Sequence, residues 1–272
     1  MIRFDALALA TVMAGASAGA ALAGDAPPEI KMPEVSVKDA KGWYVRGDLG
    51  YAVNASRNDT TFRAYDPAGG DKSSGRFDSD RFGGNFSGGL GVGYQFNDLL
   101  RADVTGDFFS GDFNGSISSA SPCSSGAGGT GCSTKARSSF RAGSLMVNGY
   151  VDLGTLAGFT PYLGAGLGAT RVSWSSVNAV GLCIDGASGC GGAASVSARY
   201  PGDSDWRMTY ALMAGVAYEV APNVKVDLGY RFSHIAGGDM FGDSSASAGG
   251  TTGRDGALSR HEIRIGLRVT TW

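Results

Sequence analysis

The sequence predicts an all-β protein: an eight-stranded antiparallel up-and-down transmembrane β-barrel with four long extracellular loops and short periplasmic turns. Three observations predict this fold. Apolar and polar residues alternate with period two in eight segments after residue 42, as they do in strands with one apolar and one polar face. Short and long connections between these segments alternate strictly, as in membrane barrels. After residue 23, no apolar run approaches the roughly 20 residues of a membrane helix.

Composition excludes several other classes. The chain has 272 residues, of which 45 are glycine, roughly two and a half times the ordinary share, but no G-X-Y repeat marks collagen. Hydrophobic residues make up 43% and charged residues 18%, which argues against a disordered chain. The net charge of −2, from 23 basic and 25 acidic residues, argues against a nucleic-acid partner.

The amino terminus has the features of an export signal. Residues 6–23 are small and apolar, Arg3 precedes them, and Ala21-Leu22-Ala23 fits a signal-peptidase site. A buried helix is the alternative interpretation. We therefore expect a signal peptide at 1–23, a periplasmic N-terminal segment at 24–41 and the outer-membrane β-barrel at 42–272.

Export places the four cysteines in an oxidising compartment. Cys123 and Cys132 are separated by eight residues, and Cys183 and Cys190 by six. Four cysteines allow three pairings, and local closure of each pair is the simplest, so we predict Cys123–Cys132 and Cys183–Cys190 disulfides on the outer surface. Zinc is the competing interpretation, but neither pair has C-x-x-C spacing and no histidine is near.

The eight strands are justified in chain order by their apolar parity. The first begins at Trp43 and continues through Val45, Leu49 and Tyr51, with Arg46 and Asp48 on the opposite face. Each later segment repeats this alternation with other side chains. The predicted strands are 43–54, 86–96, 99–109, 137–153, 159–174, 206–220, 224–235 and 260–272.

The connections between these strands fall into two classes. Asn97-Asp98, residues 154–158 and residues 221–223 are tight turns. The other four connections are long and rich in Gly, Ser and Asp, and they span 55–85, 110–136, 175–205 and 236–259.

The polar faces of the eight strands carry a balanced set of charges. If the apolar faces meet lipid, these charges lie in the lumen, because a charge at the bilayer midplane costs roughly 2–4 kcal/mol. A soluble barrel or sandwich, with apolar residues inward, is the alternative. Eight-stranded interiors are just wide enough for side chains, so we predict a lumen filled by ion pairs. The predicted network comprises seven cations, Arg46, Arg101, Arg207, Lys225, Arg231, Arg264 and Arg268, and seven anions, Asp48, Asp103, Asp107, Asp152, Asp227, Glu219 and Glu262.

Several strings carry a family resemblance. Residues 42–51 (GWYVRGDLGY), 210–218 (YALMAGVAY), 226–231 (VDLGYR) and 266–272 (GLRVTTW) together resemble the small outer-membrane proteins of alphaproteobacteria related to opacity proteins, often filed as "porin family". The resemblance covers about 42–272. It implies Sec-type export to the cell outer membrane, assembly by the barrel-assembly machinery, and roles in envelope integrity and in host or surface contact through the loops. It implies no enzyme activity and no cofactor.

The rival function is transport, as a small-solute pore or a haem-binding protein. His234 and His261 flank the last long loop symmetrically, so hairpin pairing places them side by side. Two adjacent imidazoles can bind haem iron or a divalent metal. The alternative is a pair of interfacial histidines with no ligand.

Three arginines suggest a contact with lipopolysaccharide. Arg137 and Arg141 continue the lipid-facing parity of 137–153, and Arg171 continues that of 159–174. A hairpin symmetric about residue 156 places Arg141 opposite Arg171, which is unfavourable unless an anion lies between them. Lipid phosphates are suitable anions because guanidinium groups bind them bidentately. The alternative is that both side chains extend into water.

Overall fold

The computed structural model describes residues 41–55, 60–65, 71–83, 85–120, 131–184, 195–242 and 250–271. Residues 38–272 form one compact unit that contains every described strand. The predicted signal peptide lies outside the described residues, as do Cys123, Cys190 and all but the last residue of the predicted 24–41 segment.

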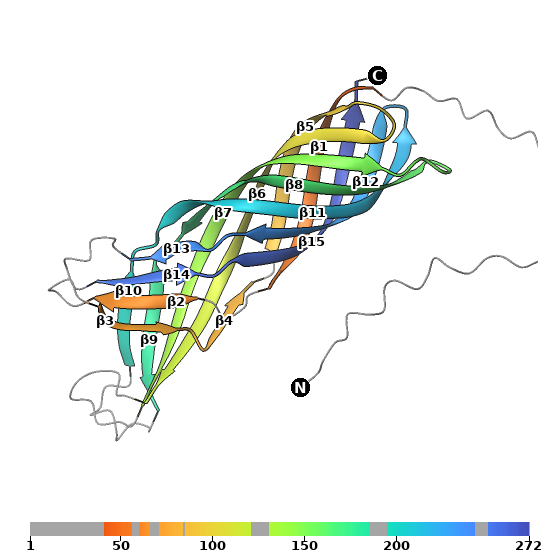
Figure 1. Ribbon diagram of the computed structural model, residues 1–272. Helices are drawn as coiled ribbons and strands as arrows, with labels where there is room; N and C mark the ends of the chain where they lie inside the picture. Colours follow the sequence, from red (N-terminus) through yellow and green to blue (C-terminus); the bar gives the residue numbers. More distant parts are fainter. Residues whose placement is uncertain are drawn as a thin grey trace, which may run out of the picture. The chain divides into compact units, whose positions relative to one another are not determined.

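Eight antiparallel strands pair in a closed ring, which confirms the predicted barrel (Figure 1). The ring runs β1-β5-β6-β7-β8-β11-β12-β15 and returns to β1. None of the described residues forms a helix that is long and apolar enough to cross a membrane. The ring strands are β1 (Gly42–Ala55), β5 (Asn85–Gln95), β6 (Leu100–Ser119), β7 (Cys132–Asp152), β8 (Phe159–Trp174), β11 (Ser204–Ala221), β12 (Val224–Ile235) and β15 (Leu258–Thr270).

Side chains alternate across the barrel wall as the sequence parity predicts. On β1, Leu49 points outward and is 68% exposed, whereas the neighbouring Asp48 points inward and is 5% exposed. Because successive strand residues face opposite sides of the sheet, each strand contributes both to an apolar outer surface and to a polar lumen. We call this part of the barrel, with its apolar exterior, the band.

The described parts of the long connections are not irregular loops. They contain seven further strands, and β6 and β7 extend ten and five residues beyond their predicted ends at 109 and 137. These strands gather at the end opposite the short turns (Figure 1), and we call them, with the ends of β6 and β7, the head. They are β2 (Thr61–Tyr65), β3 (Asp71–Arg76), β4 (Ser79–Phe82), β9 (Val177–Cys183), β10 (Ser195–Tyr200), β13 (Gly238–Phe241) and β14 (Thr251–Asp255).

A four-stranded sheet, β13-β14-β2-β3, joins the first and last long connections. The ring explains this pairing, because β15 lies beside β1 and the two hairpins rising from these strands are therefore neighbours. The remaining head strands extend ring strands: β4 pairs with β6, and β9 pairs with both β7 and β10.

The polarity of the strands inverts where they leave the band. On β6, Asp107 faces the lumen and Phe108 faces outward, but above them Phe109 and Phe113 are buried while Asp112 is exposed. The head is therefore apolar inside and polar outside. Its core consists of Phe77, Phe109, Phe113, Ala136, Phe140, Ala142, Val172, Trp174, Val177, Ile235, Met240, Phe241 and Leu258.

The predicted tight turns are present, and one of them sets a register that differs from the symmetric expectation. Ala157 (φ 51°) and Gly158 (φ 84°) close the β7–β8 hairpin with two left-handed residues, a geometry suited to short hairpins. The two residue numbers of each pair in this hairpin then add up to 314, so Arg141 lies opposite Ser173. The predicted centre at residue 156 was wrong by one residue, and this shifts every pair by two.

Candidate functional site

The lumen near the short turns is closed by buried ion pairs. The Nε of Arg101 lies 3.1 Å from Oδ1 of Asp152, and its guanidinium carbon lies 3.9 Å from the centre of the Tyr150 ring. On the other wall, Arg268 Nη2 lies 3.0 Å from Asp227 Oδ1. Buried charges are tolerated when each has a close partner of opposite sign.

A second cluster crosses the middle of the lumen. Arg46 on β1 donates to Asp48 at 2.7 Å and to Asp103 on β6 at 3.1 Å. Its Nη1 also donates to the hydroxyl of Tyr150 at 3.0 Å, and Asn148 donates to Asp103 at 2.7 Å. This network ties β1, β6 and β7 together across the interior.

The third cluster lies just below the head. Asp107 accepts hydrogen bonds from Arg231 at 2.9 Å and from Arg264 at 2.7 Å, so one carboxylate of β6 binds two cations of β12 and β15. Arg264 also lies 3.1 Å from Glu262, which accepts a hydrogen bond from Ser87. The three clusters together occupy successive levels of the lumen.

The structure buries most of the fourteen predicted lumen charges, but not all of them. Eleven are buried, and the side chain of Arg264 is 11% exposed. Lys225 is half-buried, and Glu219 is exposed, so the assignment of Glu219 to the lumen interior was wrong. The two residues face each other at the last pairs of the β11–β12 ladder, beside a bulge, where the barrel mouth opens to water.

Sequence reasoning missed Arg260 and the lumen tyrosines. Arg260 shares the inward parity of Glu262 and Arg264, and its guanidinium lies 3.6 Å from the centre of the Phe109 ring. Tyr44 is also buried on the polar parity of β1. Parity alone was sufficient to find them, because Arg260 lies in the predicted strand 260–272 and Tyr44 in 43–54, but neither was included in the predicted network.

Above the ion pairs, an aromatic cluster fills the head. Phe113 packs edge-on against Phe77 at 5.6 Å between ring centres, and Phe140 packs against Trp174 at 4.9 Å. Two cavities among the lumen side chains have volumes of about 20 and 10 Å³, enough for about one water each. The lumen is therefore obstructed twice in series, by ion pairs and by the aromatic cluster.

The two histidines do not lie opposite each other. His234 pairs with Ser259, and His261 pairs with Phe232, because the ladder continues in the same register into Gly238–Asp255 of the head. Instead, His234 stacks on Tyr210 and His261 Nδ1 lies 2.5 Å from the hydroxyl of Tyr230. The predicted side-by-side pair was wrong by two residues. Within the described ranges, no three His, Cys, Asp or Glu side chains are grouped to hold a metal.

The head carries a groove of about 660 Å³ on its four-stranded sheet. Three exposed arginines line it: Arg63, Arg76 and Arg254. Thr61 pairs with Arg76 on one side and with Arg254 on the other, so these residues form a row across one face, and Arg63 lies two positions further along β2. Asp203 and Asp239 also line the groove, and Asp239 lies 3.1 Å from Arg254.

Arg207 links this sheet to the barrel. It donates to Asp255 at 2.6 Å, to Asp205 at 2.7 Å and to the carbonyl of Asp239 at 2.9 Å. Burial raises the pKa of the Asp255 carboxyl to about 6, although Arg207 and the backbone N–H of Gly238 act in the opposite direction. Arg207 therefore connects β11 of the ring to β13 and β14 of the head.

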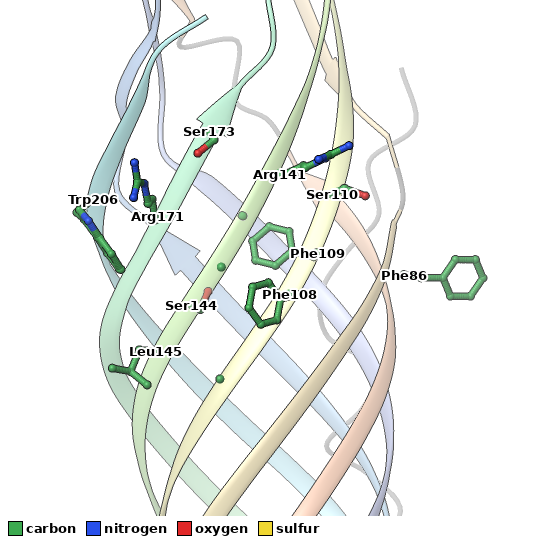
Figure 2. A pocket seen from close by; sticks show the side chains of 13 residues that line it. Phe86, Phe108, Phe109, Ser110, Arg141, Ser144, Leu145, Arg171, Ser173 and Trp206 are labelled. Carbon is green, nitrogen blue, oxygen red and sulfur yellow. The ribbon is translucent and has the colours of Figure 1, made fainter.

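A second groove, of about 810 Å³, lies on the outer surface where the band meets the head (Figure 2). Arg141 and Arg171 line it together with Phe108, Leu145 and Trp206. The two arginines are diagonal neighbours, since Arg141 pairs with Ser173 and Arg171 with Gly143. Arg137, the third arginine of the predicted lipid contact, is exposed on the same face of β7 but does not line the groove.

Two of the four cysteines are described. Cys132 and Cys183 face each other in the β7–β9 ladder, and each is disulfide-bonded. Because Cys123 and Cys190 lie outside the described residues, the pairing Cys123–Cys132 and Cys183–Cys190 stays a prediction.

Comparisons with known proteins agree with this geometry. A model of the outer membrane protein beta-barrel domain matches residues 6–268. An uncharacterized protein of Brucella abortus (strain 2308) is 32% identical over 84% of each chain. A candidate adhesin of Rickettsia bellii (strain OSU 85-389) is 29% identical, over 67% of this chain and 74% of the relative.

Two further matches are outer-membrane or surface proteins. Outer membrane protein PagN of Salmonella typhimurium (strain LT2) is 27% identical over 71% of this chain and 74% of its own. The crystal structure of Neisserial surface protein A is similar with a TM-score of 0.46 and 20% identity, covering 84% of this chain and 97% of that one. This chain belongs to the outer membrane protein β-barrel family and is a protein of the outer membrane.

Proposed function

We propose that the protein is a structural and surface-contact protein of the outer membrane, which acts through its head and neither conducts solutes nor catalyses a reaction. The observation that carries this proposal is the double obstruction of the lumen, by three levels of ion pairs and then by the aromatic cluster around Phe113 and Trp174. A solute pore needs a continuous open path. The barrel instead acts as a rigid stalk that holds the head above the membrane, on the side opposite the short periplasmic turns.

The head groove favours an anionic surface ligand. Arg76 and Arg254 stand two strands apart, roughly 10 Å, and Arg63 lies roughly 7 Å further along the sheet. The described residues that line the groove include three arginines and two aspartates. Guanidinium groups spaced in this way match repeating sulfate or carboxylate groups on a polysaccharide. The similarity to a candidate adhesin supports a role in surface contact.

The competing transport functions have weaker support. A general pore requires removal of both obstructions. A bis-histidine haem site requires two facing imidazoles, whereas His234 lies opposite Ser259 and His261 lies opposite Phe232. Both imidazoles already contact a side chain on their own face.

Binding of purified full-length protein in nanodiscs to a heparin-coated surface tests the proposal. We expect binding that weakens with rising salt, and a loss of about tenfold or more in Arg63→Ser/Arg76→Ser/Arg254→Ser, since each charge-assisted contact contributes roughly tenfold in affinity. The matched control is Arg81→Ser/Arg137→Ser/Arg199→Ser, which removes three exposed arginines of the head that do not line the groove.

Equal losses in the two triple variants would mean that net charge alone drives binding and that the groove is not the site. No binding by the wild-type protein to heparin would rule out the anionic polysaccharide. Steady solute flux through the protein would rule out the surface-contact function itself.

A further inference from the structure

The groove at the upper edge of the band combines an apolar wall with a cationic wall. It lies where the strands β6, β7, β8 and β11 change from an apolar to a polar exterior (Figure 2). In an outer-membrane protein this height is the boundary between the acyl chains and the headgroups of the outer leaflet. A ligand that fits here is therefore itself apolar below and polar above.

The strand register arranges the outer residues of this region in three rows. The upper row is hydrophilic: Ser110, Arg141, Ser173 and Ser204 pair in sequence across four strands. The middle row is mixed: Phe108, Gly143, Arg171 and Trp206. The lower row is apolar: Gly106, Leu145, Ala169 and Met208.

Arg141 and Arg171 occupy adjacent strands in neighbouring rows. As diagonal neighbours on one face, their Cβ atoms stand roughly 7–8 Å apart, a separation that two long side chains can close around one anion. Both are exposed. Among the described residues, no carboxylate forms an ion pair with either guanidinium, and neither makes a side-chain hydrogen bond. The N–H donors of each guanidinium group are thus available to an external phosphate.

The apolar wall is formed by large exposed side chains around glycine gaps. Phe108 is 73% and Trp206 64% exposed, while Gly106 has no neighbouring atom within 4 Å of the place its Cβ would occupy. A second hollow of about 610 Å³ shares Gly106 and Phe108 with the first and continues over Gly88 and Leu90. The two hollows form a path that descends along the band from the arginines.

We propose that this groove binds a phosphorylated, multiply acylated lipid of the outer leaflet, the chemistry of the lipid A part of lipopolysaccharide. One phosphate lies between Arg141 and Arg171 with Ser173 beside it, and an acyl chain lies in the hollow over Gly106. Arg137 stands four residues above Arg141, roughly 13 Å along the strand, so it is not part of the phosphate site.

Lipid retention tests this inference. Full-length protein is released from phosphatidylcholine nanodiscs that contain bisphosphorylated lipid A, and bound lipid is measured by native mass spectrometry. We expect the wild-type protein to retain lipid A and Arg141→Ser/Arg171→Ser to retain at least about tenfold less, because two charge-assisted contacts, each contributing roughly tenfold in affinity, are lost. The charge-matched control, Arg81→Ser/Arg199→Ser, changes exposed arginines that line neither of the two grooves, and it is expected to retain lipid as the wild type does.

A second variant tests the acyl wall without changing charge. Gly106→Leu projects a side chain into empty space, so it is expected to fold normally, as checked by heat-modifiable migration, and to reduce retention several-fold. Dephosphorylated lipid A is expected to be lost from the wild type as readily as from the arginine variant.

Three results would overturn the proposal. Equal retention by the wild type and Arg141→Ser/Arg171→Ser would remove the arginines from the site. Undiminished retention by Gly106→Leu would remove the groove. Equal binding of the phosphorylated diglucosamine without acyl chains would show a phosphate site with no role for the lipid.

Discussion

The band and the head are built from the same strands with opposite polarity. On β6, Thr105 and Asp107 are buried below the boundary and Phe109 and Phe113 are buried above it. The strand makes the change at adjacent phenylalanines, Phe108 facing out and Phe109 facing in. The same inversion occurs on β8, where Leu167 faces out in the band and Val172 faces in within the head. Solvent explains the difference, because lipid accepts apolar side chains that water excludes.

The alternation of apolar and polar residues and the choice of which set faces inward are separate pieces of information. Period two identifies a strand, but only the surroundings decide which parity is inside. A charged side chain fills the interior of the band, and an aromatic ring fills the interior of the head. Substitutions that place a side chain in the wrong surroundings therefore have predictable costs in stability.

The largest expected effect comes from removing the anion that binds two cations in the band. Asp107→Ala leaves Arg231 and Arg264 without their shared carboxylate, and breaking a buried ion pair costs about 4 kcal/mol. Urea unfolding of the refolded protein in lipid vesicles measures this loss. Asp112→Ala, on the exposed face of the same strand in the head, is the control and is expected to change stability by less than about 0.5 kcal/mol. Similar losses in both variants would contradict the inversion.

The next effect concerns the aromatic cluster of the head. Phe113 is fully buried, so Phe113→Ala is expected to cost about 3 kcal/mol, near the lower end for such truncations because Phe77 and Phe82 can partly fill the space. Hydrogen exchange locates the loss in the head amides. Phe108→Ala, five residues away and facing lipid, is expected to leave those amides unchanged; faster exchange there would mean that the two regions are not distinct.

A charge placed on the outer surface distinguishes lipid from water directly. Val147 is exposed on the outer face of β7 in the band, and Val180 is exposed on β9 of the head. Val147→Arg is expected to cost about 2–3 kcal/mol, since the side chain would meet acyl chains. Val180→Arg is expected to cost less than about 0.5 kcal/mol. Unfolding in vesicles checks both values. A larger loss of stability in Val180→Arg than in Val147→Arg would contradict the assignment of the band to the membrane.

The smallest effect is a pH dependence confined to the head. The pKa of Asp255 is raised to about 6 by burial, so folding favours its protonated form. The resulting stability is present below about pH 4, the ordinary pKa, and is lost as the pH rises through about 6, an effect on the order of 2 kcal/mol. Hydrogen exchange of the β13–β14 amides between pH 4 and 7, corrected for intrinsic rates, measures it.

Two variants sharpen this measurement. Asp255→Asn is expected to abolish the change in protection, and Asp239→Asn, an exposed carboxyl of the same sheet, is expected to retain it. An increase in the protection of the wild-type β13–β14 amides as the pH rises would contradict the prediction.

Much of the barrel was predictable from local patterns. The eight strands and the tight turns follow from parity and turn residues, and charges such as Arg46 and Asp107 fall on the inward face that parity assigns. Arg260 lies on the inward parity of the predicted strand 260–272 but was left out of the predicted network, whereas Phe113 was missed because residues 110–136 were assigned to a loop. The phase change at Phe108–Phe109 was the signal that β6 continues into a different solvent.

Registers and distant pairings were not predictable in the same way. Symmetric hairpins misplaced Arg171 and His261 by two residues, because a left-handed turn in one case and a ladder extending into the head in the other set the pairing. The β14–β2 contact joins residues about 190 apart in the chain and depends on closure of the barrel, which no local pattern contains.

Planar-bilayer conductance of the purified protein tests the central claim most directly, that the lumen is closed both by ion pairs in the band and by aromatic rings in the head. We expect no steady conductance from the wild type, and none from Phe113→Ala, because the ion pairs of Arg46, Arg101 and Asp107 still fill the band. Stable, ohmic channels of general-porin size in the wild-type protein would contradict the account.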